Sequence, residues 1–319
     1  MEKAARVHEV MTKVRAATMR VIMGQDTALE EVLTCFLAGG HVLVEGLPGL
    51  GKTLLARTLA RVVDADFRRI QFTPDLLPSD IVGTNIFNMR TTSFDLHKGP
   101  IFTEILLADE INRTPPKSQA ALLEAMEERQ VTIDGTRNPL PELFFVVATQ
   151  NPVEYEGTYP LPETQLDRFM MKIVVEYPSP EAELAVIQNY ARGVNLHDID
   201  PLIPVPILSK QEVLEIRKDL LTVVIRDEIM EYIRKIISET RDIVYAQLGA
   251  SPRAAVALLK ASRALAALRG EAFVTPDEVK DVAKPVLRHR VILRPEALID
   301  GLTPDYFLDN ILRSVPVPR

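Results

Sequence analysis

The chain has 319 residues, which is enough for two domains that each bury a core of their own. Hydrophobic residues make up 47% and charged residues 25% of the chain, as in ordinary globular proteins, so the composition argues against disorder. The net charge of −7 argues against a surface that binds nucleic acid throughout, and the short apolar runs argue against a membrane span, so we expect a cytoplasmic protein.

The first chemical motif lies between a predicted strand and a predicted helix. Residues His41 to Glu45 are mostly apolar and predict the strand, and the leucines and valines from Thr53 to Val63 have helical spacing. Between them runs Gly46-Leu-Pro-Gly-Leu-Gly-Lys-Thr53, which has the G-x-x-x-x-G-K-T pattern of a phosphate-binding loop. Its glycines let successive N–H groups point into one concavity, where the helix N-terminus adds partial positive charge. The expected nucleotide contacts are Gly46, Pro48, Gly49, Leu50, Gly51, Lys52, Thr53 and Leu54.

Two of these residues have defined chemistry. Lys52 supplies a point charge for the β- and γ-phosphates, and the Thr53 hydroxyl is suited to bind Mg²⁺. The loop therefore predicts a bound nucleotide with Mg²⁺, although a phosphate loop alone does not separate a kinase from a GTPase or a motor.

Two insertions in the strand and helix pattern predict β-hairpins, near residues 80–100 and 130–138. The second one contains the hairpin turn pair Asp134-Gly135. Side chains on these hairpins are candidates to grip a polypeptide or a nucleic-acid backbone, although flexible surface decoration would have the same pattern. The candidates are Met89, Arg90, Phe94, Lys98 and Arg137.

The stretch Ile105-Leu-Leu-Ala-Asp109-Glu110 predicts a buried parallel strand that ends in two adjacent carboxylates. We expect Asp109 to hold Mg²⁺ and Glu110 to polarise the water that attacks the γ-phosphate. A nucleoside kinase has little use for this second acid, whereas a hydrolase needs one. The pair therefore favours ATP hydrolysis.

A further apolar strand begins at Leu143 and ends before Asn151-Pro152. Since residues at the carboxyl ends of parallel strands face the ligand crevice, we expect Asn151 to contact the γ-phosphate or the attacking water. An Asn-Pro pair also starts many ordinary turns. Strands and helices alternate from about His41 to Tyr177, which predicts an α/β domain with a parallel sheet and helices on both faces.

The remainder of the chain changes character. Residues 178–206 are rich in proline and predict a linker that contains one helix. Helical patterns then follow to the end of the chain, including one in which Ser251 caps the helix and Pro252 occupies its first turn. We therefore predict a nucleotide-binding core over residues 1–178, and an all-α domain with its preceding linker helix over residues 179–319.

Together these motifs resemble the MoxR family of AAA+ ATPases, in the branch with helix-2 and pre-sensor-2 insertions. The resemblance spans nearly the whole chain, and its second and last segments are more specific than the nucleotide motifs. The segments are Gly46 to Thr53, Gln71-Phe-Thr-Pro-Asp-Leu-Leu-Pro-Ser-Asp80, Ala108 to Lys117 with Leu122 to Arg129, Gln165-Leu-Asp-Arg-Phe169, and Leu248-Gly-Ala-Ser-Pro-Arg-Ala254.

The resemblance implies a P-loop core with a five-stranded parallel sheet, inserted hairpins and an all-α lid. It also implies roles for Asn151 as sensor 1, for Arg168 as an arginine finger that reaches a neighbouring subunit's site, and for Arg253 as sensor 2. Gly24 and Gln25 resemble the adenine-contacting segment of the family. Simpler interpretations stay open here: a helix-end arginine for Arg168, an ion-pair partner for Arg253, and a helix-ending glycine for Gly24.

The resemblance implies a ring, with a hexamer as the expected size, in which Arg253 acts on its own or a neighbour's site. Arg113, close to Glu110, is a further candidate at the subunit boundary. Such proteins work as chaperones that remodel partners or insert cofactors, together with a von Willebrand factor A-domain protein and a client protein. The alternative is a nucleic-acid motor related to the mini-chromosome maintenance helicases. The acidic net charge makes a nucleic-acid partner less favoured, and we expect no membrane partner.

Overall fold

The structure is a computed structural model of the chain that describes residues 2–152, 157–196, 198–241 and 245–318. Its first part is built around a five-stranded sheet in the order β2-β5-β8-β1-β9, in which all neighbouring strands are parallel. The strands are β1 (Val42–Gly46), β2 (Phe67–Gln71), β5 (Ile105–Asp109), β8 (Phe145–Gln150) and β9 (Met171–Val175). The predicted five-stranded parallel core is confirmed.

Helices cover both faces of this sheet, as the strand sequences require. In β5, Ile105 and Leu107 point into one apolar cluster, whereas Leu106 and Ala108 point into the other, because successive side chains alternate across a strand. The helices of this part are α1 (Glu2–Thr18), α2 (Asp26–Leu37), α3 (Lys52–Val62), α4 (Pro78–Val82), α5 (Pro116–Glu128) and α6 (Glu163–Leu166), with a 3₁₀ turn at Ile111–Arg113. The three inner strands β5, β8 and β1 are therefore buried on both faces.

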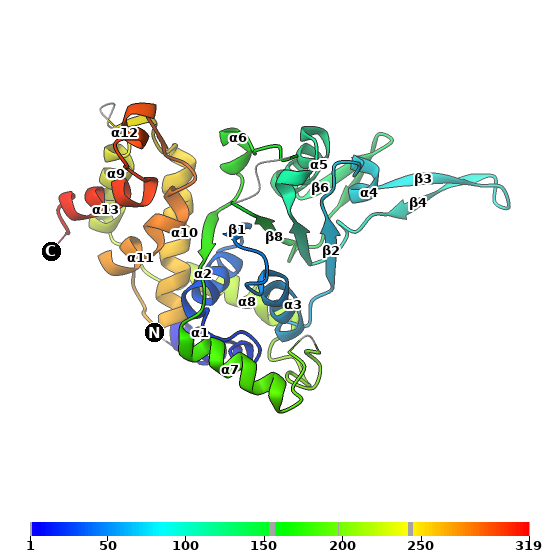
Figure 1. Cartoon of the computed structure of the whole chain (residues 1–319), viewed down its shortest axis with the longest axis horizontal. Coiled ribbons are helices and arrows are strands. Elements are labelled where there is room, and N and C mark those ends of the chain that lie inside the picture. Colours follow the sequence, from blue (N-terminus) through cyan, green and yellow to red (C-terminus); the bar gives the residue numbers. More distant parts are fainter. Residues whose placement is uncertain (1, 153–156, 197, 242–244, 319) are drawn as a thin grey trace.

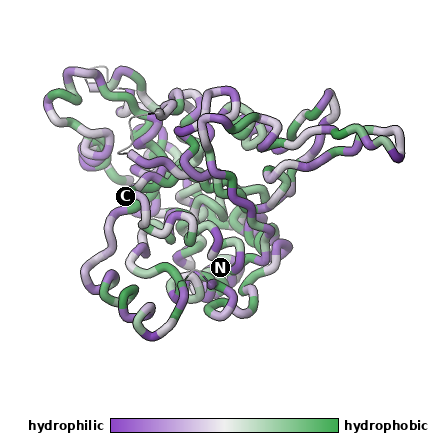
Figure 2. Tube along the Cα trace, turned by 45° about the vertical axis from the view of Figure 1, so that its right-hand side comes forward, coloured by the Kyte–Doolittle hydropathy of each residue, from purple (hydrophilic) through white to green (hydrophobic). Residues whose placement is uncertain are grey.

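Two hairpins leave this core where the sequence predicts them. Strands β3 (Gly83–Asn88) and β4 (Ser93–Lys98) pair antiparallel, and so do β6 (Gln130–Ile133) and β7 (Thr136–Pro139). The β3–β4 hairpin extends far from the body of the molecule in both views (Figures 1 and 2). Its residues are mostly exposed, so it contributes little to the core.

The segment after β9 crosses back over the first part. Helix α7 (Pro180–Ala191) has no buried residue, and the following segment reaches α3, where the N–H groups of Ile207 and Leu208 donate to Val62 O at 2.8 and 3.1 Å. Helix α8 (Lys210–Asp219) then packs against α1 and α2, and Arg217 donates to Phe36 O at 2.7 Å. A 3₁₀ turn at Leu220–Thr222 follows. The linker and α8 thus lie on the sheet domain, ahead of the helices of the lid.

The lid packs beside β9, at the left of Figure 1. Its helices are α9 (Asp227–Glu239), α10 (Pro252–Arg269), α11 (Pro276–Leu287), α12 (Pro295–Ile299) and α13 (Pro304–Ser314). The Ser251 side chain caps α10 by accepting from Ala254 N–H, and Pro252 occupies the first turn, as predicted. The lid also contains a short antiparallel ribbon of β10 (Ala246–Leu248) and β11 (Ile292–Leu293), which the all-helical expectation did not include.

One apolar cluster runs without a break from the sheet into the lid. It joins Val44 of β1 and Phe36 of α2 to Leu258 of α10 and Val286 of α11. The lid is therefore packed against the sheet domain rather than tethered to it. Among the described residues, every helix is too short or too polar to cross a membrane.

Candidate active site

The phosphate loop connects β1 to α3 and has the geometry of an anion cradle. Gly49 and Gly51 have φ angles of 84° and 79°, in the left-handed region that side chains disfavour. Gly46 is required for another reason, because a Cβ there would lie 2.7 Å from the carbonyl oxygen of Val175 on β9. The Lys52 ammonium donates to the carbonyl oxygen of Gly46, so the lysine folds over its own loop. Thr53 lies in the first turn of α3 and is half-buried.

A small hollow lies beside this loop. Its volume is about 420 Å³, within the range of small-molecule sites, and its walls come from β1, the loop, β9 and Pro152. Leu47 and Leu50 line it, so the loop offers apolar contact as well as N–H donors. Leu54 packs against the core instead, and Pro48 is exposed.

Asp109 ends β5 and is almost fully buried, with 8% of its surface exposed. Arg69 donates to one carboxylate oxygen from Nε at 3.0 Å and from Nη2 at 2.7 Å. The Thr149 hydroxyl donates to the other oxygen at 2.5 Å. A buried carboxylate needs such partners, since an isolated charge there would be costly. Arg69 and Thr149 belong to the neighbouring strands β2 and β8, and sequence reasoning gave them no role.

Glu110 lies one residue beyond the strand in a left-handed conformation, with φ 59° and ψ 50°. This conformation is uncommon for a residue other than glycine. It is held by a hydrogen bond from Glu110 N–H to Thr149 Oγ1 at 2.9 Å. Gln71 donates to the Glu110 carboxylate at 2.7 Å, and Arg113 lies 3.3 Å from it. Gln71 has this position because it pairs in register with Asp109.

The carboxyl ends of the strands bring the predicted groups to one edge of the sheet. Gly46, Gln71, Asp109 and Gln150 are the last residues of four parallel strands, and Asn151 directly follows β8. Asn151 is 7% exposed. The loop, the acid pair and Asn151 are thus gathered as predicted, and the donor set at this edge suits a triphosphate with Mg²⁺, which prefers oxygen ligands such as Thr53 and Asp109 offer.

Arg168 lies at the opposite edge of the sheet. It precedes β9, whose first residue Met171 pairs with Val42 at the start of β1, whereas the phosphate loop follows the end of β1. The length of a five-residue strand, about 16 Å, therefore separates Arg168 from its own phosphate loop along the sheet. Its guanidinium pairs with Glu127, near the end of α5, at 3.1 Å.

Arg253 also pairs with the carboxylate of Glu127. Its Nη1 lies 3.1 Å from Oε1 of Glu127, while Nε of Arg168 lies 3.1 Å from Oε2. The two arginines that the resemblance singled out come from different domains, yet one glutamate holds both. Glu127 lies in the segment Leu122 to Arg129, but the sequence does not indicate its role, because its partners follow it by 41 and 126 residues.

Gly24 and Gln25 lie between α1 and α2. Helix α1 ends at Thr18, so the interpretation of Gly24 as the glycine that ends this helix is wrong. Gly24 has φ 69°, and a Cβ there would lie 2.5 Å from Ala182 Cβ at the start of α7. The Gln25 amide donates to Glu176 O at 2.8 Å. Both residues line a cleft of about 1250 Å³ between α2 and the lid.

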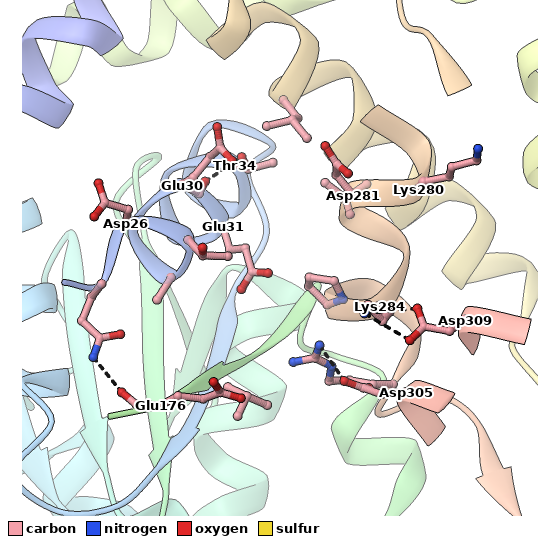
Figure 3. Close-up of a pocket in the computed structure, with 18 of the residues that line it drawn as sticks. Asp26, Glu30, Glu31, Thr34, Glu176, Lys280, Asp281, Lys284, Asp305 and Asp309 are labelled. Carbon is pink, nitrogen blue, oxygen red and sulfur yellow. Dashed lines mark hydrogen bonds and ion pairs between the residues drawn. The ribbon is translucent and has the colours of Figure 1, made fainter. Parts of the chain in front are cut away.

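Figure 3 shows this cleft, which is lined by charges of both signs. On its lid side, Arg288 pairs with Asp305 at 3.0 Å and Lys284 with Asp309 at 3.1 Å. Burial raises the pKa of Glu31 from 4.5 to about 7, and Arg288 opposes the rise. The phosphate groups of a nucleotide belong at the smaller hollow, because the glycine loop and Lys52 lie there, whereas the cleft borders the segment with Gly24.

Comparison with known proteins gives matches over the whole chain. The profile of the ATPase family associated with various cellular activities (AAA) matches residues 41–171, and the AAA lid domain profile matches residues 238–311. The chain is 43% identical to Chaperone MoxR1 of Mycobacterium tuberculosis, over 99% of this chain and 84% of that protein. It is 30% identical to Protein MoxR of Paracoccus denitrificans, over 98% of this chain and 97% of that protein.

Two further proteins are similar along their full lengths. The uncharacterized protein YeaC of Bacillus subtilis is 46% identical, over 98% of this chain and 96% of its own. A crystal structure of a candidate ATPase from Cytophaga hutchinsonii superposes with a TM-score of 0.91 at 43% identity, covering 100% of this chain and 98% of its own. Both the sheet domain and the lid thus have matching counterparts.

Proposed function

The chain belongs to the MoxR family of AAA+ ATPases, and we propose that it hydrolyses ATP at sites shared between neighbouring subunits of a ring. The energy released remodels or matures a partner protein. Family membership implies nucleotide binding, and the matching of both profiles along one chain supports a core and lid that work together. The ring is expected to be a hexamer.

This proposal rests on one observation: the phosphate-binding groups and Arg168 lie at opposite edges of the sheet. Lys52, Asp109 and Glu110 belong to the carboxyl edge of the sheet, whereas Arg168 belongs to the amino edge. An arginine finger stabilises charge on the transferring phosphoryl group and is worth about 10³- to 10⁵-fold in rate. Because Arg168 lies away from its own phosphate loop, it would serve the site of a neighbour. Its partner Arg253, on the same Glu127, would then act in trans as well.

The chemistry within one site follows from the described contacts. Glu110 is fixed by Gln71 and by its backbone bond to Thr149, so its carboxylate is oriented to accept a proton from an attacking water. Asn151 at the neighbouring strand end would orient that water or the γ-phosphate. Mg²⁺, held through Thr53 and Asp109, would neutralise charge on the phosphate oxygens.

The β3–β4 hairpin is the proposed surface for the client. Phe87 and Phe94 form an edge-to-face pair with centroids 5.3 Å apart, and 49% and 70% of their surfaces are exposed. Met89 at the tip is 86% exposed. Large exposed apolar side chains of this kind mark interaction sites. A client polypeptide fits this surface better than a nucleic-acid backbone, and the similarity to Chaperone MoxR1 supports the chaperone role over a helicase. A von Willebrand factor A-domain protein is the expected partner.

Mixing of two inactive variants tests the shared site. Lys52→Ala removes nucleotide binding from one subunit, and Arg168→Ala removes the finger from another. In mixed rings, an intact loop then meets an intact finger at some interfaces, so part of the ATPase activity should return. Mixing is verified by pulling down one tagged variant and detecting the other.

Two outcomes would count against the proposal. ATP binding by Lys52→Ala with micromolar affinity would remove the phosphate-loop assignment. Absence of any regained activity in rings shown to be mixed would argue that Arg168 does not act across subunits.

A further inference from the structure

The segment that carries Arg168 is held by one residue of the lid. Arg290 follows α11 and is almost completely buried, with 6% of its surface exposed. Its Nε donates to the Asp167 carboxylate at 2.6 Å, and Nη2 donates to the carbonyl oxygens of Asp167 and Phe169 at 3.2 and 2.7 Å. Nη1 donates to Met170 O at 2.9 Å and also to Val286 O within the lid.

These bonds use all five N–H donors of a guanidinium, which are arranged in a rigid fork. Four of the five go to residues 167–170, on both sides of Arg168. His289 adds a fifth bond from the lid, because its Nε2 lies 3.0 Å from Phe169 O, which can only accept. The backbone around Arg168 is thus fixed to the lid by a network with little freedom to shift.

We propose that Arg290 is a positioning residue for the arginine finger, and that it couples the lid of one subunit to hydrolysis in the next. The inference rests on the proposed role of Arg168 in a neighbour's site. Glu127 restrains the Arg168 side chain, while Arg290 sets its backbone. When the lid moves, residues 167–170 move with it, so the finger approaches or leaves the neighbouring γ-phosphate.

The chain offers a matched control two residues away. Arg288 is also a lid arginine with little exposure, 12% of its side chain, and it also reaches β9, by donating to Lys172 O at 3.4 Å. Its ion pair, however, is with Asp305 of α13, and the structure describes no bond from it to residues 167–170. Loss of Arg288 should therefore weaken the contact between lid and sheet without displacing the finger.

A double-mutant cycle on the full-length protein separates positioning from a structural role. Arg290→Lys keeps the charge but cannot reproduce the fork, so kcat should fall about 10- to 100-fold while the KM for ATP changes little, because misplacement of a catalytic group by about 1 Å costs this much. In an Arg168→Ala background the same substitution should cost less than about twofold, since residues that act through one another are not additive. Single turnovers of radiolabelled ATP keep slow rates measurable, and Arg288→Lys is the control in both backgrounds.

Mixed rings give an independent test. If Arg290 acts through the finger, Arg290→Lys subunits should regain activity with Lys52→Ala subunits but not with Arg168→Ala subunits. Equal losses of kcat in both backgrounds, or failure of Lys52→Ala to restore activity, would overturn the proposal. Should Arg290→Lys lower the melting temperature markedly, Asp167→Asn replaces it in the same cycle, since it removes the negative charge that pairs with Arg290 and keeps the side-chain shape.

The same experiments distinguish the positioning role of Arg290 from the finger role of Arg168, on which it rests. An unchanged kcat in Arg168→Ala would overturn both the finger and its positioning. A large loss in Arg168→Ala, combined with additive effects of Arg290→Lys, would overturn the positioning role alone.

Discussion

Replacement of Glu31 by glutamine should stabilise the protein in a pH-dependent manner. Glu31 lies on α2 at the cleft between the sheet domain and the lid (Figure 3), and burial raises its pKa from 4.5 to about 7. Below pH 4.5 the carboxyl is protonated in both the folded and the unfolded chain and costs nothing. As the pH rises, the unfolded chain loses this proton first, so the free energy of unfolding falls until the pH passes 7.

The magnitude follows from the pKa change. At 1.36 kcal/mol per pKa unit, a rise from 4.5 to about 7 corresponds to at most about 3 kcal/mol at pH 8. Glu31→Gln has no titrating group, so its advantage over the natural protein should be small at pH 5 and grow toward this value at pH 8. Urea unfolding at pH 5, 6, 7 and 8, at one subunit concentration, measures the difference.

An exposed glutamate provides the control. The hydrogen bond with Lys13 lowers the pKa of Glu9 on α1, so Glu9→Gln should give no stabilisation that grows with pH. A Glu31→Gln advantage that is constant with pH, or that grows as the pH falls, would refute the reasoning.

Three further predictions concern hydrolysis, folding and the client surface. Glu110→Gln should bind ATP but hydrolyse it about 10²- to 10⁴-fold more slowly, and normal turnover would exclude Glu110 as the base. Burial lowers the pKa of His41 from 6.5 to about 3, so the unfolded chain takes up the proton first and stability should fall as the pH drops below 6.5; a charged His41 ring at pH 5 by NMR would contradict this. Phe94→Ser should reduce the proteins captured by a Glu110→Gln trap with ATP, whereas Ile299→Ser, at a lid position that is even more exposed (84% against 70%), should not. Capture of DNA in place of protein would favour the helicase alternative.

The sequence predicted those parts of the site whose signal is local. The phosphate loop, the acid pair and the cap of α10 each depend on neighbouring residues, and the structure has all three where they were predicted. The parallel sheet could also be predicted, because buried strands alternate with helices along the chain.

The residues that the sequence did not indicate depend on contacts between distant segments. Arg69 reaches Asp109 only because β2 pairs with β5, and the strand order is set by the whole sheet. Glu127 holds Arg168 and Arg253 through an approach of α5, the segment before β9 and the lid. Such contacts leave no fixed spacing along the chain, so composition and periodicity cannot reveal them.

The contacts between the lid and the sheet domain restrict how the lid can move. Since one apolar cluster joins the sheet to the lid, separating them would expose apolar surface at about 25 cal/mol per Å². The hydrogen bonds of Arg290 to residues 167–170 add a directional restraint at the same interface. In the proposed ring, movement driven by nucleotide would therefore be easier between subunits than within one, because these bonds join the lid to the segment that carries Arg168. A ring that places the finger edge of one subunit against the loop edge of the next would convert such movement directly into a change of hydrolysis rate.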